Sequence, residues 1–344
     1  MCSRKLCVAC WSRSTGATGN KGRTHPVRRH IGQGTGWRQP LSGPIQTAME
    51  LPLSPNSAPD GRLPELPGWV QRLSGGSAED AALASGVALG VLDVTLAHFA
   101  LPQELWRRRL ALLAAQNCVA MNRRTESESE LRDILCMLRP DDQPGPAGEI
   151  ALIWQRAIAT PVTQARGPQG LPGDAERLRD IWMAKRAGNP VAQAAQVIED
   201  VLSDDPRADL AALILADAAI ARAARWRYLV PLLGIGLRRR DLNLRAAPTG
   251  LACHRALPLT IALALSRAAD LTRRATYLQA LVPKLRAKQA ALAVDRFLSR
   301  DALSPAALTD LMSDRAARRL CARLVALGAV RELTGRDSFR IYGL

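Results

Sequence analysis

The segment Ser313–Leu344 reads SDRAARRLCARLVALGAVRELTGRDSFRIYGL, and its periodicity changes part of the way along. A helical pattern covers about 314–327 and ends before Gly328. Two runs of alternating apolar and polar residues follow, with Gly335 between them. This arrangement predicts a β-hairpin whose tip is Gly335 and its neighbour Arg336.

Two further helical patterns precede this segment, at about 284–299 and 305–311. Three helices followed by a two-stranded wing is the order of a winged helix-turn-helix. The third helix then has the position of the recognition helix, which enters the major groove of DNA in helix-turn-helix proteins. We therefore predict a winged-helix domain with one small β-hairpin over residues 284–344.

The third helix is expected to present arginines on the side opposite its core. At 100° per residue, Ala317, Leu320, Leu324 and Leu327 share one face. Arginine side chains occupy the other face and its margin, and guanidinium groups suit both phosphates and guanine edges. The helix contributes four candidate nucleic-acid-binding residues, which are Arg315, Arg318, Arg319 and Arg323.

The hairpin supplies three more candidates, Arg331, Arg336 and Arg340. With the tip at Gly335 and Arg336, Val330 pairs with Ile341 and Arg331 lies opposite Arg340. Like charges directly opposed across two strands are unfavourable, and a bound phosphate would relieve the repulsion.

Two functions remain open for this tail. In the first, the protein is a DNA-associated or regulatory module whose partner is double-stranded DNA. In the second, the same arginines form a solvated face, and the protein is an interaction scaffold whose winged helix packs on the body or on a partner protein without binding nucleic acid.

The rest of the chain predicts a mainly α fold, with a multi-helical body before the winged helix. Ala and Leu fill the apolar positions and aromatic residues make up 4%, a composition that favours helices over sheets. A Pro- and Gly-rich lead-in is expected at 49–76 and a helical domain at 77–283. Within that domain helices are predicted at about 77–99, 102–121, 127–138, 147–159, 175–187, 190–202, 209–225 and 257–280, with 229–237 ambiguous.

Residues 1–48 are predicted to be disordered, because they lack hydrophobic periodicity. They hold eight basic residues and no acid, so they account for half of the net charge of +16. We expect an over-called extension in front of a true start at Met49, although an Arg-rich transit peptide has a similar composition. The remaining charge is mostly Arg in an Ala-rich chain and is weak evidence of a polyanionic partner.

No metal, cofactor or catalytic residue is predicted. Cys7, Cys10, His25 and His30 have zinc-finger spacing, but Ser14 and Gly22 stand where the small core needs apolar residues, so we interpret the pattern as coincidence. There is no GxxxxGK[ST] phosphate loop, and Gly234-Ile-Gly236 lacks the third glycine of a dinucleotide fingerprint.

An enzyme is the less favoured hypothesis. It would require His98, His254 or acidic positions to converge on a pocket between helices. Asp93 and His98 are five residues apart and do not share a helical face well, and Glu126, Glu128 and Glu130 are expected to form a solvated helix start.

The cysteines and the lack of a continuous apolar segment both bear on the expected cellular location. Cys118, Cys136, Cys253 and Cys321 lie apart in apolar helical patterns, as reduced buried cysteines do. The most apolar stretch, 81–100, is interrupted by Asp93 and His98. We expect a cytoplasmic protein with no membrane contact.

The tail Ser313–Leu344 resembles the C-terminus of a bacterial family known as domain of unknown function 1403. Leu66-Pro-Gly-Trp69, 139–148 (RPDDQPGPAG) and 283–288 (PKLRAK) are also similar to that family. The resemblance covers about Leu63–Leu344 and leaves 1–48 outside. It implies a bacterial cytoplasmic protein with no assigned activity, and it provides no catalytic residues.

Overall fold

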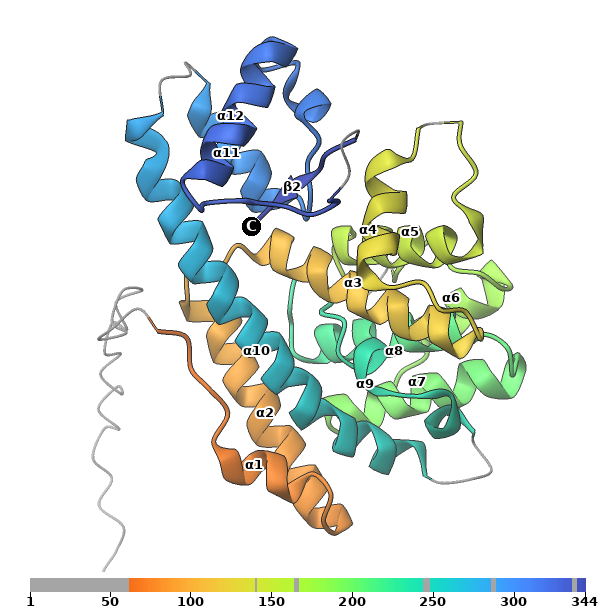
Figure 1. The fold of residues 1–344 in the computed structure, drawn as a ribbon. Coiled ribbons are helices and arrows are strands. Elements are labelled where there is room, and N and C mark those ends of the chain that lie inside the picture. Colours follow the sequence, from red (N-terminus) through yellow and green to blue (C-terminus); the bar gives the residue numbers. More distant parts are fainter. Residues whose placement is uncertain (1–61, 140, 164–166, 244–247, 286–288, 336–338) are drawn as a thin grey trace, which may run out of the picture. The chain divides into compact units, whose positions relative to one another are not determined.

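The computed structural model describes residues 62–139, 141–163, 167–243, 248–285, 289–335 and 339–344. The predictions for 1–48, including the zinc-finger spacing and the start at Met49, therefore lie outside the described residues. Residues 53–344 belong to one compact unit. The described part is mainly helical, as predicted, with one short two-stranded sheet (Figure 1).

The helices follow the predicted order closely. They are α1 (Gly68–Leu73), α2 (Ala78–His98), α3 (Gln103–Met121), α4 (Glu128–Met137), α5 (Gly145–Ala159), α6 (Ala175–Met183), α7 (Pro190–Asp204), α8 (Asp209–Ala223), α9 (Leu233–Gly236), α10 (Thr249–Leu281), α11 (Ala290–Ser299) and α12 (Asp314–Ala326). Short 3-10 helices are η1 (Arg239–Leu242), η2 (Val282–Lys284) and η3 (Pro305–Leu308).

Side-chain caps fix several helix starts. At α2, the Ser77 hydroxyl accepts from the Asp80 backbone N–H and the Asp80 carboxylate accepts from the Ser77 N–H, which is a capping box. Ser127 and Glu130 form the same reciprocal pair at α4. These caps satisfy backbone donors that the first turn leaves without a helical partner.

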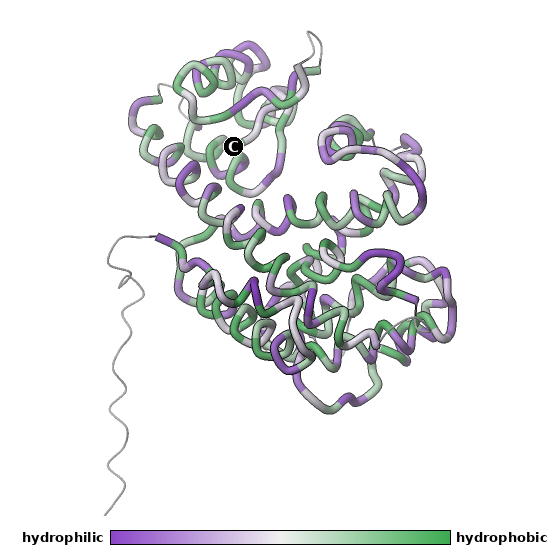
Figure 2. Tube along the Cα trace, turned by 60° about the horizontal axis from the view of Figure 1, so that its bottom comes forward, coloured by the Kyte–Doolittle hydropathy of each residue, from purple (hydrophilic) through white to green (hydrophobic). Residues whose placement is uncertain are grey.

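The core is built around the long helix α10, which lies alongside α2 (Figure 1). Trp106 of α3 is fully buried and donates its indole N–H to the carbonyl of Ala264, so α3 is fixed across α10. α7 and α8 pair with each other, and α7 also contacts α10. Hydrophobic and hydrophilic residues alternate along the helical turns in Figure 2, as amphipathic helices with an apolar core-facing side require.

Several predicted helix boundaries were wrong. The helix expected at 284–299 begins only at Ala290, and the helix expected at 175–187 ends at Met183. The helix expected to start at Leu257 begins eight residues earlier, at Thr249, and continues through Pro258. Proline suits a first helical turn, which is why the pattern placed the start there. Burial of Cys253 and Leu257 in the core stabilises the earlier turns in spite of the missing proline N–H. Within the predicted Pro- and Gly-rich lead-in, Gly68–Leu73 forms a short helix.

The C-terminal segment contains α11, η3 and α12, followed by the antiparallel strands β1 (Arg331–Glu332) and β2 (Tyr342–Gly343). Tyr342 exchanges two backbone hydrogen bonds of 2.8 Å with Leu303, which precedes η3. β2 therefore lies between β1 and an extended residue that follows α11.

The predicted hairpin register was wrong. Arg331 lies opposite Gly343 and Glu332 opposite Tyr342, so Val330 does not pair with Ile341 and Arg331 does not oppose Arg340. The Leu333 N–H donates to the Ile341 carbonyl, so the connecting loop is longer than a two-residue tip. The predicted register assumed the shortest loop between the two strands. The position of β2 is also fixed by its backbone hydrogen bonds to Leu303, which lies outside the hairpin sequence.

Candidate nucleic-acid interface

The side of α12 that faces away from the core carries the predicted arginines. Ser313 caps the helix by accepting from the Ala316 N–H. Ala317, Leu320, Cys321 and Leu324 are buried on one side of the helix. The arginines on the other side are all exposed, and they are Arg315, Arg318, Arg319 and Arg323.

Three of these four arginines have no ion-pair partner among the described residues. Arg318 forms an ion pair of 2.8 Å with Asp314 one turn earlier, and this hydrogen bond raises the pKa of Arg318. Arg315, Arg319 and Arg323 form no ion pair with any other residue that the structure describes. The residues 284–344 contain 12 Lys and Arg against 6 Asp and Glu, so the helix belongs to a basic segment.

The hairpin arginines are placed less favourably than predicted. Arg331 is exposed at the end of β1. Arg340 lies 3.7 Å from Glu332, so the carboxylate on the opposite strand partly compensates its charge. Arg336 lies outside the described residues. Arg331 and Arg340 are not directly opposed, so there is no like-charge repulsion between them for a bound phosphate to relieve.

The C-terminal segment docks on α3 and α4 through a different side. Asp301 accepts from Arg109 Nε at 2.9 Å and from Arg132 Nε at 2.5 Å, and the three side chains are 10–12% exposed. A second nitrogen of Arg109 donates to the Leu344 carbonyl at 2.6 Å. Burial lowers the pKa of Arg109, an effect that Asp301 opposes.

Nothing local in the sequence indicates this cluster, because Asp301 follows a helix end in a polar Ser-Arg-Asp stretch that is typical of a solvated surface. Its partners are 169 and 192 residues away. A single sequence carries no signal for such a pairing. In Figure 1, β2 and the chain end at Leu344 lie next to α3, whereas α12 lies farther from it. The docking contacts therefore leave the arginine face of α12 uncovered.

The histidines and acids considered for catalysis do not converge. His98 is exposed at the end of α2. His254 Nδ1 lies 2.6 Å from the hydroxyl of Ser85, a pair that sequence analysis did not identify. Burial lowers the pKa of His254, and the Ser85 hydroxyl also lies 2.9 Å from the Ala82 carbonyl. The pair thus joins α10 to α2.

Asp93 and the candidate acids have structural partners. The Asp93 carboxylate accepts from the indole of Trp226 at 2.7 Å. Glu128 pairs with Arg132, and Glu130 closes the α4 capping box. Among the residues that the structure describes, no group of three or more His, Cys, Asp or Glu side chains could hold a metal ion.

One described helix, α2, is long and apolar enough to cross a membrane by length and composition. Core helices of soluble proteins meet the same criterion, so this finding is weak evidence of a membrane span. Ala84, Ala88 and Leu92 of α2 are fully buried in the core.

The fold and this surface define a mainly helical protein that carries a basic helix next to a small β-hairpin. No curated protein and no solved structure is significantly similar to the chain. The family described as "Protein of unknown function (DUF1403)" matches residues 55–344. The chain therefore belongs to this family, which confirms the resemblance found in the tail.

Proposed function

We propose that residues 284–344 form a winged helix and that the arginine face of α12 binds double-stranded DNA. The order α11, Leu303, η3, α12, β1, β2 supports the winged-helix assignment, because an extended residue before the second helix joins the hairpin as a third strand position. α12 then takes the place of the recognition helix, whose side chains enter the major groove in helix-turn-helix proteins.

The observation that carries the proposal is the exposure of Arg315, Arg319 and Arg323 without ion-pair partners among the described residues. Opposite charges one turn apart stabilise a helix, as Arg318 and Asp314 do, and the other three α12 arginines have no such partner among the described residues. Three uncompensated guanidinium groups on one helix side match the phosphates that position a protein on DNA.

The alternative is a scaffold in which this unit only packs on the body or on a partner protein. Packing on the body uses Asp301 and the end of β2, together with a hydrogen bond of 2.8 Å from the Tyr277 hydroxyl to the Leu327 carbonyl. None of these contacts uses the α12 arginines, which supports the DNA-binding proposal over body packing. A protein partner at the arginine face would have to be acidic. A bacterial cytoplasmic location is part of the same proposal.

The test compares two triple variants of equal charge in a mobility-shift assay on duplex DNA. Arg315→Ala/Arg319→Ala/Arg323→Ala removes the three arginines of the α12 face that carry the proposal. Arg177→Ala/Arg179→Ala/Arg225→Ala removes three exposed arginines from the helical body. Because both lose three positive charges, non-specific attraction falls equally in both.

We expect the α12 variant to bind at least about a hundredfold more weakly than wild type, since each lost phosphate or base contact weakens binding severalfold. The body variant should lose much less. Equal affinity of the α12 variant and wild type would refute the proposal. A stoichiometric acidic protein that co-purifies from native cells, is lost with the α12 variant and is free of nucleic acid would support the scaffold instead.

A further inference from the structure

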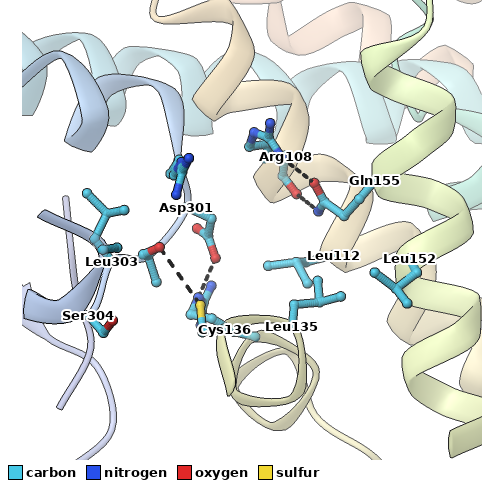
Figure 3. Close-up of a pocket in the computed structure, with 13 residues that line it drawn as sticks. Arg108, Leu112, Leu135, Cys136, Leu152, Gln155, Asp301, Leu303 and Ser304 are labelled. Carbon is cyan, nitrogen blue, oxygen red and sulfur yellow. Dashed lines mark hydrogen bonds and ion pairs between the residues drawn. The ribbon is translucent and has the colours of Figure 1, made fainter. Parts of the chain in front are cut away.

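A cavity of about 390 Å³ lies where the C-terminal segment meets the helical body. Its walls come from α3, α4 and α5 on one side and from residues 300–307 on the other. In Figure 3, Leu112, Leu135 and Leu152 of the body lie together, and Leu303 and Asp301 lie across from them. The volume is within the range of about 300–1,000 Å³ that is typical of small-molecule sites.

The cavity combines an apolar lining with an excess of positive charge. The half-buried Leu135 and Leu152 provide most of the apolar surface, because Leu112 and Leu303 behind them are buried. The lining also holds three arginines, Arg108, Arg132 and Arg300, against one carboxylate, that of Asp301. Both oxygens of Asp301 are already occupied, one by Arg109 and the other by Arg132. Its charge is therefore compensated before any ligand binds.

The three arginines that line the cavity differ in their hydrogen bonds and ion pairs. Arg132 is held by Asp301 and Glu128, and Arg108 bonds to Glu104 and to the Gln155 amide. The guanidinium of Arg300 forms no hydrogen bond or ion pair with any residue in the described ranges, and Arg300 is exposed at the cavity. Arg300 is thus a cation available to a bound anion, and the Gln155 side chain lies on the same wall as Arg108 (Figure 3).

We propose that this cavity binds a small amphipathic carboxylate, with its carboxylate on Arg300 and its apolar body among Leu112, Leu135, Leu152 and Leu303. Guanidinium groups pair with carboxylates through two parallel hydrogen bonds. An alkyl or aromatic portion would cover the exposed parts of Leu135 and Leu152. Both the body and the segment leading to η3 line the site, so a bound ligand also stabilises the docking of the C-terminal segment.

Isothermal titration calorimetry measures ligand binding directly and involves no DNA. Its result is therefore independent of whether α12 binds DNA. The probe is octanoate, which has both the charge and the apolar chain. Octanamide keeps the chain and the polar end but lacks the charge, and inorganic phosphate keeps the charge but lacks the chain. We expect saturable one-to-one binding of octanoate and at least about tenfold weaker binding of the other two.

Two variants locate the site, and a third serves as the control. Arg300→Gln should weaken octanoate binding by about tenfold or more without affecting folding, because its side chain has no partner to lose. Leu152→Trp should abolish binding by filling the cavity. Arg156→Gln, on the exposed side of the same helix as Leu152, should bind as wild type does. The proposal is overturned by any of three results: no octanoate binding, equal binding of octanamide, or unchanged binding by Arg300→Gln.

Discussion

Arg109 and Asp301 form an ion pair of 2.9 Å across 192 residues of sequence, and both side chains are nearly buried. One carboxylate oxygen belongs to Arg109 and the other to Arg132, so a single acid joins α3 and α4 to the segment after α11. The basic helix α12 is therefore held by contacts that do not involve its own arginines. Docking and the proposed DNA contact are separable by mutation.

Replacing Asp301 is expected to destabilise the protein strongly. Asp301→Ala leaves two buried guanidinium groups without their shared counter-charge, and removing one member of a buried pair costs about 3–5 kcal/mol. Urea unfolding followed by circular dichroism measures the loss. Asp310→Ala is the matched control, because Asp310 pairs with Arg296 at the exposed surface. A loss for Asp301→Ala no larger than that for Asp310→Ala would show that the buried pair does not stabilise docking.

The salt dependence of DNA binding reports on single arginines. A contact with one phosphate contributes about 0.9 to the slope of log affinity against log salt concentration. Arg319→Ala should therefore lower the absolute slope by about one, whereas Arg179→Ala on α6 should leave it unchanged. The measurement is fluorescence anisotropy of labelled duplex DNA at several salt concentrations. An unaltered slope in Arg319→Ala would show that this guanidinium does not neutralise a phosphate.

The sequence predicted most of the helices, because period 3.6 patterns and caps such as Ser77 with Asp80 are local. It also placed Arg315, Arg318 and Arg319 opposite the core face of α12 correctly. The hairpin register failed, since it depends on Leu303, which lies before α12 in the chain. The cavity and the Asp301 cluster were not predictable either, because their residues come from helices that only the tertiary fold brings together.

Asp217 is expected to make stability depend on pH in a defined direction. Its carboxylate is buried and accepts backbone N–H groups of Leu232, Leu233 and Gly234. Burial raises the pKa of Asp217 to about 7, against the lowering effect of those hydrogen bonds. The native state thus holds this proton more tightly than the unfolded chain, so its contribution to stability falls as pH rises from about 4 to about 7.

The Asp217→Asn variant tests this assignment. Asn does not ionise. As pH rises from 4 to 7, the free energy of unfolding of the wild type should therefore fall relative to that of the variant. Relative to the ionised carboxylate, the variant also loses an acceptor for the N–H groups of α9, at a cost of about 1–3 kcal/mol. Glu199→Gln, an exposed acid on α7, should show no such shift. A constant difference for Asp217→Asn across this range would contradict the raised pKa.

Gly234 is expected to be intolerant of any side chain. A Cβ at this position would lie 2.4 Å from the buried ring of Trp154 and 3.2 Å from Ala114, so Gly234→Ala forces a rigid core ring to move. Overpacking of this kind costs about 1–3 kcal/mol. Gly86 on α2 is the control, since a Cβ there meets no atom within 4 Å, and Gly86→Ala should stabilise the helix by about 0.5–1 kcal/mol. Opposite signs in urea unfolding would show that Gly234-Ile-Gly236 serves packing, whereas a neutral Gly234→Ala would contradict the close approach of Trp154.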